Sequence, residues 1–127
     1  LRTRADINRW LLWESSSWFG SCYVYLVENC VKPLLGDTTD ENILSNEEEN
    51  FHKLASILNN RLEHSIYLCG NEPTIADVAV AAPMHLHAWA KLPLGDYPNL
   101  IRWMTKDVES CSWWKDTHIG EGFTLPE

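Results

Sequence analysis

The chain has 127 residues, of which 45% are hydrophobic and 22% are charged, and its formal net charge is −8. A chain of this length can bury a substantial core, so we expect residues 1–127 to form a single domain. The acidic balance argues against a nucleic acid partner, which would need a basic face, and the lack of any apolar run of about 18 residues argues against a membrane span.

The first predicted element covers residues 3–31. This stretch contains no proline and only one glycine, Gly20, so we expect one long helix or two nearly continuous helices. The Lys32-Pro33 dipeptide would end it, because the residue before a proline disfavours helical backbone angles. Apolar side chains are spread broadly around this helix, which favours burial on more than one side.

An acidic loop at residues 36–42 separates this helix from the next. Ser45 and Glu48 have the spacing of a capping box, in which each side chain accepts a hydrogen bond from the other residue's backbone N–H. The second helix is therefore expected to start near Asn46. Apolar residues then recur every three or four positions, which predicts one buried stripe. The stripe consists of Phe51, Leu54, Ala55, Leu58 and Leu62.

A second capping box, formed by Thr74 and Asp77, marks the start of a third helix. The run at residues 79–90 is apolar on nearly every side, and such a helix belongs in the middle of a bundle. We therefore expect it to be the most buried element and to end near Lys91. Pro83 interrupts the run, and because proline lacks a backbone N–H and crowds the preceding turn, a kink is expected there.

The segment at residues 66–73, which links these two helices, is short and contains glycine and proline, so an extended loop is a better interpretation than a strand. Pro98 suits the first turn of a fourth helix. Its apolar stripe comprises Leu100, Trp103, Met104, Asp107 or Val108, and Cys111. A last helical turn around residues 113–115 precedes a glycine-containing tail. Together these elements predict an all-α fold, a bundle of about five main helices.

Several polar residues could suggest chemistry, but a structural role explains each of them better. His85 and His87 are two positions apart, so on a helix they point about 200° from each other and do not bind one metal ion together. Ser15 and its two serine neighbours lack a G-x-S-x-G motif and an identifiable base. Asp77 is better explained as a cap than as an acid or base. The four cysteines are widely spaced without a C-x-x-C motif, which indicates reduced thiols in a cytoplasmic protein.

Three short pieces follow one another in the second half of the chain: YLCG at residues 67–70, PTIAD at residues 73–77 and YPNL at residues 97–100, followed by Trp103. Together with the long first helix, the acidic loop and the amphipathic helix, they resemble the C-terminal domain of glutathione S-transferases. The pieces similar to bacterial members of that family are Arg4-Ala5, Trp10, Trp13-Glu14 and VKPLLG at residues 31–36. The resemblance covers nearly the whole chain, and its most specific part is the order of the pieces.

The resemblance implies a cytoplasmic and usually dimeric protein whose full length carries a separate N-terminal thioredoxin-like domain. That domain, absent here, would hold glutathione as co-substrate and the catalytic Tyr, Ser or Cys. This chain would then be the helical half and would supply the side of the site that binds a small electrophilic substrate. Its first helix would form part of a homodimer interface. The chain would be inactive alone, with no catalytic residue and no metal. Domains of this fold also serve as non-catalytic interaction modules for protein assembly, and this alternative stays open.

The substrate side is expected on the first helix, where Trp13, Ser16, Ser17 and Gly20 lie three or four residues apart and so share one face. One flat aromatic side chain and three small residues would leave a groove with hydroxyl groups beside it, as a mostly apolar electrophile requires. The resemblance implies that this face lies opposite the glutathione sulfur and that the C-terminal segment with Trp114 closes over it. Close helix packing through Ser and Gly is the alternative. The face assigned to the core comprises Leu11, Trp18, Cys22 and Tyr25.

Overall fold

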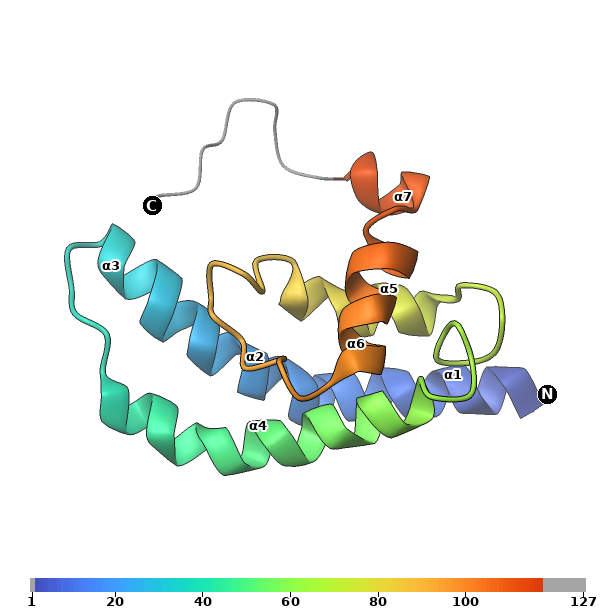
Figure 1. Cartoon of the computed structure of the whole chain (residues 1–127), viewed down its shortest axis with the longest axis horizontal. Coiled ribbons are helices and arrows are strands. Elements are labelled where there is room, and N and C mark those ends of the chain that lie inside the picture. The colour runs from blue at the N-terminus through green and yellow to red at the C-terminus, as the bar shows by residue number, and fades with distance from the viewer. Residues whose placement is uncertain (1, 118–127) are drawn as a thin grey trace.

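The computed structural model describes residues 2–117, and within them the chain is helical, with no β-structure beyond one isolated antiparallel bridge between Tyr67 and Gly70. The predicted all-α bundle of five main helices is confirmed for this part of the chain (Figure 1). These are a long N-terminal body over residues 2–34, α4 (Glu41–Arg61), α5 (Ile75–Ala81), the body formed by α6 (Pro98–Arg102) with the π-helical η4 (Trp103–Val108), and α7 (Ser112–Lys115). None of the helices over residues 2–117 combines the length and apolarity that crossing a bilayer requires.

The N-terminal body is one nearly continuous helix. Its pieces are α1 (Arg2–Trp13), η1 (Glu14–Trp18), α2 (Phe19–Leu26), η2 (Val27–Val31) and α3 (Lys32–Leu34). Both η segments are π-helical turns, which widen the helix and shift the residues that follow around its axis. Pro33 does not end the helix as predicted: the N–H of Lys32 already bonds five residues back to Val27, so the regular ladder is interrupted before the proline. The helix ends just before Gly36, whose φ of +80° is left-handed.

The second helix, α4, begins before the predicted start near Asn46, because Asp40 is its N-cap. The Asp40 carboxylate accepts hydrogen bonds from the backbone N–H groups of Asn42 at 2.9 Å and Ile43 at 3.4 Å. Ser45 therefore lies inside the helix, and the capping box predicted there is wrong. The predicted stripe is confirmed, since all five of its residues are buried: Phe51, Leu54, Ala55, Leu58 and Leu62.

The helix α5 is shorter and less buried than predicted. Pro83 ends it through the 3₁₀ turn η3 (Ala82–Met84), because a proline has no N–H to continue the ladder, and turns follow as far as Lys91. The expected kink in a longer helix is therefore wrong. One face is buried, but Val78 is 43% exposed and Ala82 is exposed too. The described residues leave this second face uncovered, so the expected burial on nearly every side is wrong, although four of the seven α5 residues are buried, a larger share than in any other helix over residues 2–117.

Aromatic side chains join the first three helical bodies in the core. Trp18 is fully buried and stacks on Trp13, with ring centroids 5.6 Å apart, and on Phe51 of α4 at 5.4 Å. Its indole N–H donates to the carbonyl of Val80, near the end of α5, at 3.0 Å. One indole thus connects the N-terminal body, α4 and α5, which fixes the spacing between the two helices that form the site below.

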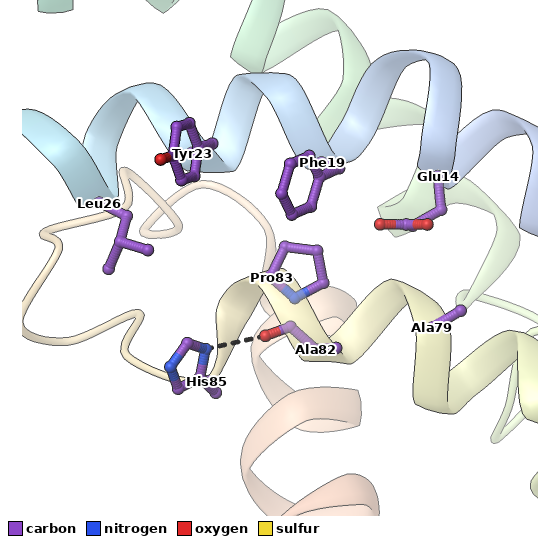
Figure 2. Close-up of a pocket in the computed structure, with 8 residues that line it drawn as sticks. All are labelled: Glu14, Phe19, Tyr23, Leu26, Ala79, Ala82, Pro83 and His85. Atoms are coloured by element: carbon purple, nitrogen blue, oxygen red, sulfur yellow. Dashed lines mark hydrogen bonds between the residues drawn. The ribbon is translucent and has the colours of Figure 1, made fainter.

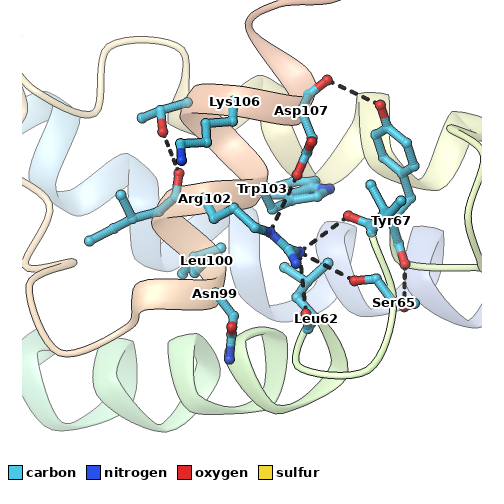
Figure 3. A network of polar contacts seen from close by, with 12 residues as sticks. Leu62, Ser65, Tyr67, Asn99, Leu100, Arg102, Trp103, Lys106 and Asp107 are labelled. Atoms are coloured by element: carbon cyan, nitrogen blue, oxygen red, sulfur yellow. Dashed lines mark hydrogen bonds and ion pairs between the residues drawn. The ribbon is translucent and has the colours of Figure 1, made fainter.

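Arg102 fastens the segment after α4 to the α6 body (Figure 3). Its Nη2 donates to three carbonyl oxygens, those of Leu62 at 3.2 Å, Ser65 at 3.2 Å and Ile66 at 3.3 Å. Its Nε lies 3.3 Å from the carboxylate of Asp107, whose carbonyl accepts a hydrogen bond from the Tyr67 hydroxyl at 3.2 Å. These contacts hold the segment that leads to Leu68. The backbone N–H of Leu68 donates a hydrogen bond to Asp77 at the start of α5.

Candidate functional site

The residues at the start of α5 form a reciprocal capping box. The Thr74 hydroxyl accepts from the N–H of Ala76 at 3.2 Å, and the N–H of Thr74 donates to Asp77 Oδ2 at 2.9 Å. The other oxygen, Asp77 Oδ1, accepts from the N–H of Leu68 at 3.0 Å and from the indole N–H of Trp103 at 2.9 Å. Since both oxygens of this fully buried carboxylate are occupied by structural donors, its geometry is that of a cap and a cross-link.

None of the residues predicted to bind substrate lines either of the two pockets described below. Trp13 is half-buried, packed against Trp18, and it contacts the core. Ser16 is exposed, and its hydroxyl lies 3.4 Å from that of Ser17. Gly20 is exposed, and a side chain added there would meet nothing within 4 Å. Trp114, on α7, packs against Trp113 with ring centroids 6.1 Å apart.

The π-helical turn η1 explains why these residues diverge. The predicted face assumed regular α-helical spacing from Trp13 to Gly20, but η1 covers residues 14–18 and rotates the positions after it. As a result, Phe19 and Tyr23 face α5 (Figure 2). The role predicted for Trp13, Ser16, Ser17 and Gly20 stays a prediction. The tail expected to close over the site lies outside the described residues, apart from α7.

A pocket of about 390 Å³ lies between the N-terminal body and the end of α5 (Figure 2). Its walls are Glu14, Phe19, Tyr23, Leu26, Ala79, Ala82, Pro83 and His85. The rings of Phe19 and Tyr23 stack on each other, with centroids 5.5 Å apart and an angle of 17° between their planes. They are 48% and 50% exposed, so a flat aromatic surface is open to a ligand.

Two polar side chains stand in this apolar lining, and Figure 2 shows them toward opposite ends of the pocket. The carboxylate of Glu14 has no hydrogen-bond or ion-pair partner among residues 2–117, and burial raises the pKa of this carboxyl. His85 donates through Nδ1 to the carbonyl of Ala82 at 2.9 Å, which leaves Nε2 of the neutral ring as an acceptor. The pocket therefore offers acceptors to a mostly apolar ligand.

Sequence reasoning missed this pocket for identifiable reasons. In the sequence, Glu14 belongs to the Trp13-Glu14 dipeptide, and Phe19 is one of many apolar residues spread around the helix predicted for residues 3–31. The spacing of Phe19, Tyr23 and Leu26 marks one helix face, and an acidic residue one turn before it was the available signal. His85 was expected inside a helix, whereas the chain has already left the helix at η3.

A second, smaller pocket of about 280 Å³ lies beside the turns that follow α5. His87 at its edge pairs through Nε2 with Glu109 at 2.9 Å, which links those turns to the end of η4. No group of three or more His, Cys, Asp or Glu side chains within residues 2–117 is arranged to hold a metal ion. The first pocket is the better candidate site, because it is more apolar and has an unpartnered charge.

The chain is similar to glutathione S-transferases of known sequence. The profile of the family "Glutathione S-transferase, C-terminal domain" matches residues 24–110. A glutathione S-transferase of Hyoscyamus muticus is 27% identical over 113 residues, which cover 87% of this chain and 53% of that protein. Glutathione S-transferase 1 of Zea mays is 26% identical over 115 residues, which cover 88% of this chain and 53% of that protein. Both sources are plants, so the likeness to bacterial members stays a prediction.

Solved structures show the same fold. Glutathione S-transferase III in its apo form matches with a TM-score of 0.85 and 22% identity, over 97% of this chain and 57% of that one. Glutathione S-transferase I bound with lactoylglutathione matches with a TM-score of 0.78 and 23% identity, over 91% of this chain and 56% of that one. The chain spans about half the length of the curated relatives it matches. Because the family profile covers more than half of its residues, the chain belongs to the family of glutathione S-transferase C-terminal domains.

Proposed function

We propose that residues 1–127 form a single domain that is the helical half of a glutathione S-transferase and supplies the electrophile-binding side of its site. The observation that carries this proposal is the apolar pocket between α2 and α5, with its exposed Phe19 and Tyr23 rings. Such a pocket suits a mostly apolar small molecule. Glutathione would be the co-substrate and would be held by another domain of the full-length protein.

The cysteine thiols of this chain support the proposal that glutathione supplies the nucleophile. In the proposed reaction a thiolate sulfur forms a bond to an electrophilic carbon, and the displaced electron pair leaves with the leaving group or takes up a proton. Burial raises the pKa of Cys22, Cys30 and Cys69, so near neutral pH these groups are thiols, which are poor nucleophiles. We therefore propose that the thiolate comes from glutathione and not from these three cysteines, and that the chain alone is inactive.

The remaining parts of the proposal concern assembly and location. A homodimer that uses the N-terminal body would cover some of its exposed apolar side chains, such as Leu12. Sedimentation of the full-length protein should then give a dimer at micromolar concentration, and a monomer would contradict this part. We place the protein in the cytoplasm, in keeping with its four free cysteines.

The test is glutathione conjugation to an aryl halide by the protein that the gene encodes. Ala82→Phe would fill the pocket from an exposed position, so it should raise KM for the aryl halide while KM for glutathione stays unchanged. Ala5→Phe, an equal change at an exposed residue of α1 outside the pocket lining, is the matched control. Equal kinetics for both variants would contradict the proposed site.

The alternative is a non-catalytic interaction module. Leu34 and Leu35, at the end of the N-terminal body, are 58% and 80% exposed, and apolar side chains this open are common at contacts with other proteins. An interaction module would conjugate no electrophile even as the full-length protein. The coding sequence before Leu1 also separates the two functions, because a thioredoxin-like segment there favours the enzyme.

A further inference from the structure

The pocket between α2 and α5 contains a negative charge without a counter-charge. Glu14 is the only acidic residue of the lining, and within residues 2–117 neither an arginine, a lysine nor a backbone N–H pairs with its carboxylate. Burial raises the pKa of Glu14, which means that its surroundings penalise the ionised form. A ligand that brings a positive charge would remove this penalty.

The aromatic wall next to Glu14 favours the same kind of ligand. Phe19 and Tyr23 present stacked rings to the pocket, and the face of an aromatic ring attracts both a flat ligand ring and a cation. The far end of the pocket has no cation from lysine or arginine either. There Nδ1 of His85 donates to the carbonyl of Ala82, so Nε2 is the ring nitrogen left for a ligand. An anionic ligand would instead meet the Glu14 carboxylate and a chain of net charge −8.

We propose that this pocket selects flat aromatic ligands that carry a protonated amine, with the ammonium group on Glu14 and the ring against Phe19 and Tyr23. The inference rests on the proposed function and deepens it, because it names the preferred substrates as aromatic electrophiles with an ammonium group. Neutral aromatic ligands bind through the same apolar walls but lack the charge-assisted hydrogen bond.

The test compares two ligands of nearly equal shape, naphthylmethylammonium and its neutral analogue naphthylmethanol. Their binding to the full-length protein is measured by calorimetry near neutral pH, without glutathione. The ammonium is expected to bind about tenfold more tightly, as a single charge-assisted contact provides. In Glu14→Gln this preference should vanish while naphthylmethanol keeps its affinity. Glu49→Gln, which removes one exposed charge outside the pocket, should keep the preference.

Folding of the variant is checked independently. Glu14→Gln should unfold at the same denaturant concentration as the parent or at a higher one, because it removes a penalised charge. If it does not fold, the parent protein still decides the question: naphthoate, the anionic analogue, should bind more weakly than naphthylmethanol. The inference is overturned if the three ligands bind alike, if none binds, or if Glu49→Gln abolishes the preference as Glu14→Gln does.

Conjugation assays on the same preparation separate this inference from the proposed function. Glutathione conjugation without any preference for ammonium-bearing electrophiles removes the inference and leaves the proposed function. A preference for the ammonium probe without conjugation of any electrophile removes the enzymatic proposal and leaves a pocket for aromatic cations.

Discussion

Asp77 is a single residue on which three segments depend, since it accepts from Thr74, Leu68 and Trp103. Asp77→Ala should lower the free energy of unfolding by about 3 kcal/mol, because it removes a cap and leaves two further buried donors unpaired. Thr74→Ala should cost about 1 kcal/mol. Denaturant midpoints of both single variants and the double variant measure these values. We expect strong non-additivity, because the two residues share one motif, and simple additivity would count against the reciprocal box.

Tyr25 makes stability sensitive to alkaline pH. Burial, with smaller contributions from Glu48 and Glu47, raises its pKa to about 12. Because the folded pKa lies above the unfolded value of about 10, the phenol contributes stability that is fully present below pH about 10 and is lost as pH rises through about 12. Tyr25→Phe should therefore lose less stability over this range than the parent. Parallel losses in urea titrations across that range would show that Tyr25 is not responsible.

Among the elements, α4 has two residues near its start whose side chains suit an N-cap, Asp40 and Ser45, and the structure shows that Asp40 is the cap. Asp40 accepts the first free N–H groups of the helix, whereas Ser45 lies inside it. Asp40→Ala should lower the free energy of unfolding by about 1 kcal/mol, and Ser45→Ala should change it little, because alanine is favoured inside a helix. Thermal or urea unfolding of the two variants gives the comparison. A larger loss for Ser45→Ala would restore the later helix start.

Local sequence patterns predict some features of these helices and miss others. The Thr74 and Asp77 cap and the stripe from Phe51 to Leu62 depend on neighbouring residues, and their patterns are legible in the sequence. The π-helical turn at residues 14–18 leaves no comparable pattern, yet it decides which side chains of the first helix face α5. Pro83 has a clear local effect, but whether it kinks or ends a helix depends on packing around it.

At the scale of the whole molecule, the fold was predictable from the order of helices, whereas the pocket between α2 and α5 was not. The bundle follows from periodicity and caps, whereas a pocket needs two elements at a known spacing, here set by Trp18 between the N-terminal body and α5. The sequence predicts substrate binding on the first helix and assigns Ser16, Ser17 and Gly20 to the binding face, and this assignment stays a prediction. The structure makes Phe19 and Tyr23 the better candidates.

We propose that the electrophile lies between α2 and α5. The most direct measurement is a crystal structure of the full-length protein with a bound S-aryl glutathione conjugate. The aryl group is expected to contact Phe19, Tyr23 and Pro83. An aryl group seated instead on Trp13, Ser16 and Gly20, or away from the N-terminal body altogether, would contradict it.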